Sequence, residues 1–322
     1  MKWINNVIWF SAGGIMCLAL CLAIGFSDSA RVMEERPVVS TVTVSPDVPL
    51  QVTFCDHPLD LTRYNMYEGM DRELSSFTYY HSTTLLLFKR ANRYFPVMEP
   101  ILKASGVPDD FKYLAVIESH LDPNAVSPAR AVGIWQFMEG TAKEYGLTVT
   151  PTVDERCHLE RSTEAACRYL KEAYAKYGDW VTVAASYNAG MGRISSEMGR
   201  QQVASALDLW LVEETSRYVY RMLAVKQIFE HPYRYGFVLT AGNLYKPLVY
   251  DEVTVADDIP DLAAYAKAQG VTYADLKRYN PWLKDSKLSV AGKSFVLHIP
   301  RCESVSYETP NRTAHDARWT VQ

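Results

Sequence analysis

Cysteine is scarce in this sequence, and its charges carry no basic excess. Six cysteines in 322 residues are too few for a disulfide scaffold. No CxxC pair and no cysteine–histidine cluster has the spacing of a zinc site. Lysine and arginine number 33 against 37 acids, a net charge of −4, which gives no electrostatic footprint for nucleic acid. We therefore expect no metal, no cofactor and no nucleic-acid partner. Whether Cys157 pairs with Cys167 stays open, and burial as free thiols is the preferred interpretation.

The sequence also lacks long repeats and low-complexity tracts. Apolar residues make up 48% and charged residues 22%, which excludes a disordered chain and a polytopic membrane protein. The uncharged apolar stretch 7–26 is long enough to span a bilayer, or it belongs to a signal peptide. We assign 1–30 as a signal peptide or N-terminal membrane anchor, with lipidation at Cys21 as a third alternative. All three alternatives place the protein in the cell envelope or periplasm. An uncleaved anchor or a lipid would also attach it to the membrane.

Four further regions follow this N-terminal stretch. Residues 31–71 are expected to form an extended tether with one strand at 38–44. The segment 72–240 has helical periodicity, with one helix following Ser162 and another over 217–229. The pattern of 251–300 is strand, helix, helix, strand, and 301–322 is a C-terminal tail. The sequence therefore predicts a mainly α protein with a small βααβ domain.

One glutamate, Glu118, follows the apolar stripe of a helix, where burying a charged carboxylate costs free energy. A helix that opens at Pro108 carries an apolar stripe through Leu114, and that stripe continues to Glu118. Burial disfavours the charged carboxylate and raises its pKa, which suits a general acid. The alternative is that Glu118 simply emerges at the helix end, where 121–123 stops the helix.

Two other motifs offer polar groups among aromatic or small residues. In Gly133-Ile134-Trp135-Gln136-Phe137, the amide of Gln136 is either core filler or a hydrogen-bonding group for a sugar. In 184–190, small residues allow close helix packing, and Tyr187 and Asn188 follow them at a glycine-terminated helix end.

These motifs together resemble the catalytic domain of the soluble-lytic-transglycosylase type, in particular the membrane-bound lytic murein transglycosylase D group. The resemblance runs from about 94 to 235. It is carried by Leu114-Ala115-Val116-Ile117-Glu118-Ser119, Ala125-Val126-Ser127, Gly133-Ile134-Trp135-Gln136-Phe137, Tyr145-Gly146-Leu147, Val153-Asp154-Glu155-Arg156, Gly178-Asp179-Trp180, Tyr187-Asn188-Ala189-Gly190 and Glu214-Thr215-Ser216-Arg217-Tyr218-Val219.

The resemblance implies a goose-type, lysozyme-like helical fold and a peptidoglycan substrate. It implies cleavage of the β-1,4 bond between N-acetylmuramic acid and N-acetylglucosamine without added water, leaving 1,6-anhydro ends. Glu118 would be the single catalytic acid and then base, and the protein is expected to be a monomer. The substrate-binding residues implied are Ser119, which would also orient Glu118, and Gln136, Tyr187, Asn188 and Tyr218.

Other nearby residues are interpreted as structural. Asp122 and Glu139 are expected to be a helix-end acid and a surface acid, and His120 a surface residue. Members of the family usually carry glycine where this chain has Arg130, so a changed loop is expected there if that glycine has positive φ.

The segment 252–300 resembles a LysM module, a βααβ fold that binds glycans containing N-acetylglucosamine. The usual Gly-Asp-Thr-Leu turn is replaced by 257–262, so a docking cap without sugar affinity is the alternative. For the whole chain two other functions stay open: a lysozyme-like muramidase that uses water, and a non-enzymatic peptidoglycan-binding protein.

Overall fold

The computed structural model describes residues 43–308 and 310–321. The expected signal peptide or anchor, 1–30, and most of the strand expected at 38–44 lie outside these residues. Within the described part of the chain, no helix is both long enough and apolar enough to cross a membrane. Residues 46–322 form one compact unit, to which the following description applies.

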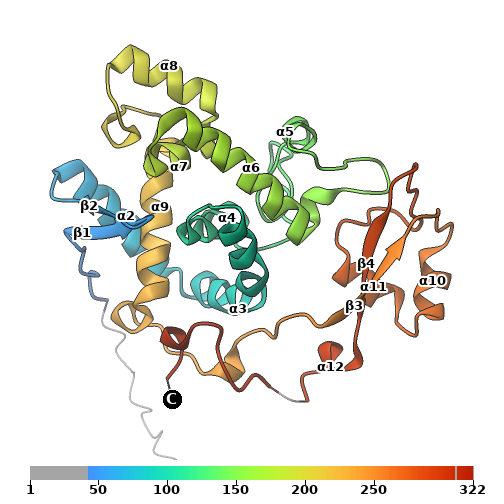
Figure 1. Cartoon of the computed structure of the whole chain (residues 1–322). Helices are drawn as coiled ribbons and strands as arrows, with labels where there is room; N and C mark the ends of the chain where they lie inside the picture. The colour runs from blue at the N-terminus through green and yellow to red at the C-terminus, as the bar shows by residue number, and fades with distance from the viewer. Residues whose placement is uncertain (1–42, 309, 322) are drawn as a thin grey trace, which may run out of the picture. The chain divides into compact units, whose positions relative to one another are not determined.

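Helices dominate the first two thirds of this unit, as expected (Figure 1). Their apolar faces meet in one core that includes Phe88, Leu114, Leu170 and Ile228, all fully buried. The helices are α2 (Tyr64–Tyr79), α3 (His81–Ala104), α4 (Lys112–Ser119), α5 (Glu139–Glu144), α6 (Leu159–Tyr177), α7 (Trp180–Ala189), α8 (Met191–Gln201) and α9 (Glu213–Glu230).

The beginning of α6 differs from the sequence prediction. The helix starts at Leu159 rather than after Ser162, and Ser162 is completely buried inside it. Its hydroxyl donates to the carbonyl of His158 at 2.7 Å, so Ser162 bonds back within the first turn instead of capping the helix. The other helix, α9 (Glu213–Glu230), covers the predicted 217–229 and begins four residues earlier.

The expectation of an extended tether over 31–71 is wrong for its second half. Strands β1 (Gln51–Phe54) and β2 (His57–Asp60) form an antiparallel hairpin, and α2 follows directly. Phe54 and Leu61 are buried in the helical core. Burial of these apolar side chains makes the hairpin part of the helical domain.

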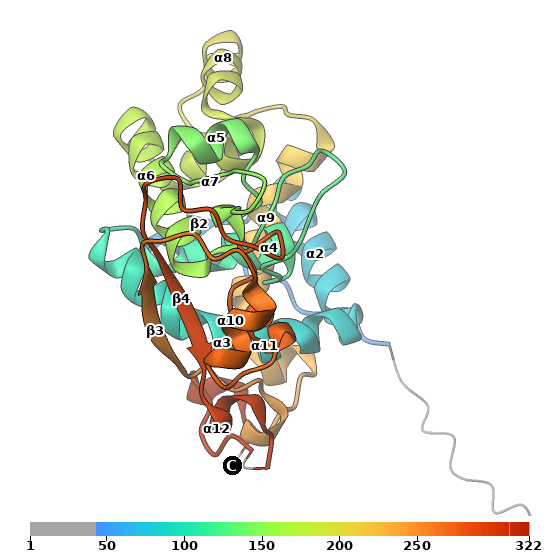
Figure 2. The ribbon, with the colours of Figure 1, turned by 90° about the vertical axis from the view of Figure 1, so that its right-hand side faces the viewer.

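The C-terminal domain has the predicted order of elements. Strands β3 (Tyr250–Val255) and β4 (Phe295–Pro300) pair antiparallel, with Tyr250 opposite Pro300. Between them lie α10 (Leu262–Ala268) and α11 (Tyr273–Tyr279), beside the two-stranded ribbon in Figure 2. A short helix, α12 (Cys302–Val305), follows the second strand.

This domain packs against the helical domain through a largely apolar seam. Val132, Val153 and Cys157 of the helical domain share a buried cluster with Trp282 and Leu283. Two backbone hydrogen bonds also cross the seam: the Asp154 N–H donates to the Trp282 carbonyl at 2.8 Å, and the Lys284 N–H donates to the Thr152 carbonyl at 2.9 Å. Cys157 and Cys167 are both free and buried, so they do not form a disulfide.

The segment 301–322 is not a loose tail. Trp319 is 2% exposed and packs among the aromatic side chains of α3 and α9. Thr320 forms a parallel bridge with Leu239, and the His315 N–H donates to Asn92 Oδ1 at 2.8 Å. The chain therefore returns to the helical domain after the βααβ domain.

Candidate active site

Glu118 lies in the last turn of α4, where α4 packs against α9 (Figure 1). The helix stops just beyond it because His120 and Leu121 both adopt left-handed φ, 53° and 56°. From α9, the hydroxyl of Tyr218 donates a hydrogen bond to Glu118 Oε1. Tyr218 is buried and Glu118 is half-buried, so the phenol holds the carboxyl from the side of the protein interior.

Burial raises the pKa of Glu118 to about 7. The hydrogen bond from Tyr218 and the positive charge of Arg221 oppose this rise, and the exposed Glu214 adds slightly to it. A carboxyl with this pKa is populated in both protonation states near neutrality. It can therefore donate a proton and then accept one, which is what acid–base catalysis by a single residue requires.

Ser119 holds the end of α4 to the next motif. Its hydroxyl donates to the Ile134 carbonyl at 2.8 Å and accepts from the Asp122 N–H at 3.3 Å. Its hydrogen bonds go to the backbone and not to the Glu118 carboxylate, so Ser119 orients Glu118 only through the helix end.

The turn at 133–136 is shaped by a close backbone approach. Gly133 has φ of 87°, and a Cβ at that position would lie 1.9 Å from the Arg156 carbonyl oxygen. The Arg156 side chain forms a buried ion pair with Asp154 at 2.8 Å and donates to the Phe137 carbonyl at 3.2 Å. Arg130, where the resemblance led us to expect glycine, takes the strained φ of 66°.

The side-chain amides of Gln136 and Asn188 each use one atom in a hydrogen bond within the protein and leave the other available. Gln136 Nε2 donates to the Gly133 carbonyl at 2.8 Å and the Ala125 carbonyl at 3.2 Å, which leaves the amide oxygen to accept. Asn188 Oδ1 accepts from Thr215 Oγ1 at 2.9 Å, which leaves the amide nitrogen to donate. Thr215 lies about one helical turn before Tyr218 on α9, so this contact ties Asn188 to the helix that carries Tyr218.

Tyr187 is fixed by its hydroxyl and its ring. The hydroxyl donates to the Trp135 carbonyl at 2.8 Å, and the ring packs edge-on against Phe137 and Tyr169. Burial, together with the nearby charge of Glu118, raises the pKa of Tyr187 far above its usual range. Tyr187 therefore lies near Glu118 as a neutral phenol and couples α7 to the 133–137 turn.

The two acids closest to the motifs of the site in the sequence, Asp122 and Glu139, form contacts that have a structural role. Asp122 accepts from Arg90 Nη2 at 3.2 Å and caps the Asn124 N–H at 2.9 Å, beyond the helix end. Glu139 is exposed and pairs with Lys143. His120 is half-buried rather than fully on the surface, and burial lowers its pKa.

The sequence did not identify the supporting role of Arg217. Its Nε donates to Glu73 Oε1 at 2.7 Å, and that carboxylate is only 1% exposed. The pair joins α2 to α9 one residue before Tyr218 and so fixes the helix that carries the phenol. The position of Arg217 next to Tyr218 in the motif could have indicated a supporting role. Its partner Glu73, however, is 144 residues away in the sequence and could not be identified from it.

Comparison with known proteins agrees with the motifs. Residues 97–208 match the family model described as transglycosylase SLT domain, and residues 251–303 match the soluble lytic transglycosylase C-terminal LysM-like domain. The resemblance expected from the sequence is confirmed for both domains.

Curated relatives extend the comparison. The chain is 31% identical over 239 residues to membrane-bound lytic murein transglycosylase D of Escherichia coli K12, covering 73% of this chain and 51% of the relative. It is 33% identical over 106 residues to membrane-bound lytic murein transglycosylase F of Salmonella arizonae, covering 30% and 19%. A 124-residue match to peptidoglycan transglycosylase gp16 of Escherichia phage T7 is 33% identical and covers 33% and 9%. The chain thus spans about half the length of the first of these relatives.

Proposed function

Because the chain contains a transglycosylase SLT domain and a LysM-like domain of the soluble lytic transglycosylase type, we propose that it is a peptidoglycan lytic transglycosylase. It cleaves the β-1,4 bond between N-acetylmuramic acid and N-acetylglucosamine and leaves 1,6-anhydro-muramoyl ends. The observation that carries this proposal is the half-buried carboxyl of Glu118, whose pKa is raised to about 7 and which Tyr218 holds by a hydrogen bond.

The proposed reaction uses Glu118 twice. Protonated Glu118 donates its proton to the glycosidic oxygen as the bond from that oxygen to the muramoyl C1 breaks. The resulting carboxylate then removes the proton of the muramoyl C6 hydroxyl, and the C6 oxygen bonds to C1 to close the anhydro ring. No water is added, and Glu118 ends protonated, ready for the next cycle.

Tyr218 makes this alternation feasible. Its hydroxyl donates to Oε1 and stabilises the carboxylate form, while Oε2 is left to exchange the proton with the substrate. Without that hydrogen bond, burial alone would hold the carboxyl more firmly in its protonated state.

The substrate acetamide takes the place of a second carboxylate: its carbonyl oxygen bonds to C1 as the glycosidic bond breaks, and that bond breaks in turn when the C6 oxygen bonds to C1. Two-carboxylate glycosidases place the second acid about 5–9 Å from the first. Here the other acid whose charge acts on the pKa of Glu118 is Glu214, and its side chain is exposed to solvent. We assign the acetamide N–H to the free oxygen of Gln136 and the acetamide carbonyl to the free nitrogen of Asn188, because their other amide atoms are already engaged.

The remaining assignments follow from this reaction. The substrate lies in the bacterial cell wall, so the protein acts in the cell envelope or periplasm, as a monomer, with its N-terminus as signal peptide or anchor. Ser119 and Tyr187 contribute to substrate binding by holding the 133–137 turn in place. The LysM-like domain keeps the enzyme on glycans that contain N-acetylglucosamine and raises the local substrate concentration.

The products of peptidoglycan digestion test this function directly. Purified peptidoglycan treated with the protein should yield muropeptides one water lighter than hydrolysis products and without a reducing end, read by mass spectrometry. Muropeptides with reducing muramic acid ends would instead identify a muramidase. Absence of any cleavage would leave the non-enzymatic alternative and refute the proposal.

The rate should fall on the alkaline side with a midpoint near the raised pKa of Glu118, about 7. Glu118 must be protonated to start the reaction, so raising the pH through its pKa removes the active form. Changing Tyr218 to phenylalanine deletes a hydrogen bond that lowers the pKa of Glu118, so the midpoint should move to higher pH. Initial rates across the pH range measure both effects.

The matched control is Tyr220→Phe, the same change two residues along α9 at a side chain that does not bond Glu118. Its alkaline midpoint should equal that of the parent protein. A midpoint for Tyr218→Phe that stays in place or moves to lower pH would contradict the role given to this phenol.

A further inference from the structure

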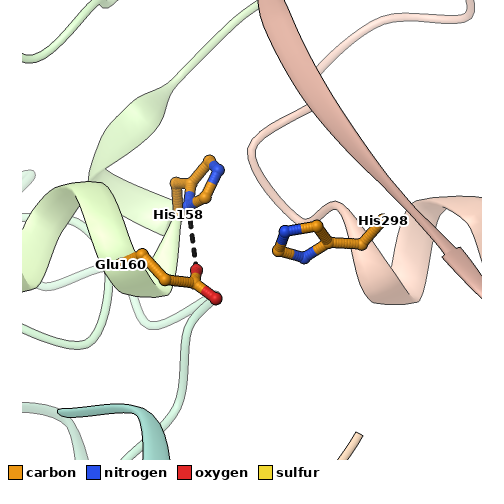
Figure 3. A group of neighbouring side chains, drawn as sticks. All are labelled: His158, Glu160 and His298. Carbon is orange, nitrogen blue, oxygen red and sulfur yellow. Dashed lines mark ion pairs between the residues drawn. The ribbon is translucent and has the colours of Figure 1, made fainter. Parts of the chain in front are cut away.

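Two histidines and one glutamate meet at the seam between the helical domain and the LysM-like domain. His158 and Glu160 come from the beginning of α6, and His298 comes from β4 (Figure 3). One ligand atom of each residue lies within 4.8 Å of those of the other two. Figure 3 shows the His158 and Glu160 side chains on one side and the His298 ring facing them from the other.

The ring nitrogen of His158 faces the Glu160 carboxylate. His158 is 8% exposed, and its Nδ1 lies 3.1 Å from Glu160 Oε2, an ion-pair contact that is poorly aligned for a hydrogen bond. A buried polar atom with a poorly aligned partner is not fully satisfied. A cation placed between Nδ1 and the carboxylate would satisfy both groups.

The three side chains are held in place by their neighbours. The His158 ring stacks on Trp282 with ring centres 5.7 Å apart, and the His298 ring stacks on Tyr250 at 3.8 Å. The Tyr250 hydroxyl donates to Glu160 Oε1 at 3.0 Å, which leaves Oε2 facing His158 Nδ1. Such outer contacts orient metal ligands and strengthen metal sites.

The backbone of His298 is fixed as well. The fully buried Asn280 donates to the His298 carbonyl at 2.7 Å and accepts from the His298 N–H at 2.8 Å. Both bonds lie within the LysM-like domain, so this domain presents His298 as a rigid element to the two residues of the helical domain.

The cluster is open to solvent. A hollow of about 420 Å³ is lined by all three residues together with Glu252 and Arg161, and it offers a path for an ion.

From this arrangement we propose that His158, Glu160 and His298 bind a zinc ion that joins the LysM-like domain to the helical domain. Two imidazoles and one carboxylate are ligands that Zn²⁺ accepts at about 2.0–2.2 Å, and a water would complete a tetrahedron. Binding would draw the three ligand atoms, which lie within 4.8 Å of one another, closer together around the ion. The ion is a structural clamp, independent of Glu118 and of the proposed reaction.

Zinc titration of the full-length chain, purified without a histidine tag, tests this site. Calorimetry should show one Zn²⁺ per chain, and the melting temperature should rise when zinc is added but not when Mg²⁺ is added, because Mg²⁺ prefers all-oxygen ligands. Each of His158→Gln, Glu160→Gln and His298→Gln should weaken zinc binding at least tenfold, in line with the loss of one ligand of three.

His57→Gln is the control, because His57 is an exposed histidine on β2 outside the cluster. It should bind zinc like the parent chain. The Glu160→Gln variant keeps both rings and their stacking, so it separates loss of a ligand from loss of folding. No saturable binding, or affinity unchanged in all three cluster variants, would overturn the proposal, and neither result bears on the activity of Glu118.

Discussion

Replacing Glu118 by glutamine should lower the rate of peptidoglycan cleavage by about 10²–10⁴-fold, the usual contribution of a positioned general acid or base. Glutamine keeps the size of the side chain and can still accept the hydrogen bond of Tyr218. It has no titratable proton, so it can neither protonate the glycosidic oxygen nor take the proton of the C6 hydroxyl. The release of anhydro-muropeptides from purified peptidoglycan measures this loss.

The matched control for Glu118→Gln is Glu139→Gln. Glu139 is an exposed acid on α5 whose ion pair with Lys143 is a surface contact, worth little to stability. This variant should retain the parent rate. Full activity in Glu118→Gln, with anhydro products unchanged, would refute the role of Glu118. Thermal melting of both variants shows whether any loss comes from chemistry or from unfolding.

Much of the site could be predicted from the sequence because its residues lie in local motifs. The apolar stripe that leads to Glu118 predicts a buried carboxyl, and its raised pKa follows from burial as the largest cause. The phenol of Tyr218 could be placed near Glu118 only through the family resemblance. Neither periodicity nor spacing indicates that α9 crosses α4 at that residue.

The roles of other predicted residues changed with their hydrogen bonds. Ser119 was expected to orient Glu118 and instead holds the 133–137 turn through the Ile134 carbonyl. The choice among several acceptors close to a hydroxyl depends on the tertiary fold, which a linear motif does not contain. Substrate binding by Ser119, Gln136, Tyr187, Asn188 and Tyr218 stays a prediction.

Long-range contacts explain what the sequence could not predict. The spacing of the sequence does not indicate the cluster of His158, Glu160 and His298, because His298 lies on β4, separated from His158 by α6 to α9 and most of the LysM-like domain. The hairpin at 51–60 is too short for a clear strand pattern, and its burial depends on helices that follow it. The local sequence pattern predicts individual helices and strands well, but it does not predict which of them pack together.

The C-terminal segment is the clearest case, because one side chain in it belongs to the main core. Trp319 lies in a single 3₁₀ turn, Ala317–Trp319, with no periodic pattern around it. Its ring packs against Phe229 at 5.4 Å between centres, Phe88 at 5.8 Å and Phe95 at 6.0 Å. These rings belong to α3 and α9, so the last residues of the chain close the core around the helix that carries Tyr218.

Changing Trp319 to alanine should therefore lower the free energy of unfolding by about 3–5 kcal/mol, the range for a large aromatic removed from a core. The indole N–H of Trp319 has no hydrogen-bond partner, so the loss comes from packing and not from a polar contact. Trp210→Ala makes the same change at a side chain that is 86% exposed, and it should shift stability by less than about 0.5 kcal/mol. Urea unfolding followed by circular dichroism measures both variants. Equal stability in the two would mean that the C-terminal segment does not pack on the core in solution, whereas a loss confined to Trp319→Ala shows that the segment after the LysM-like domain supports the fold of the catalytic domain.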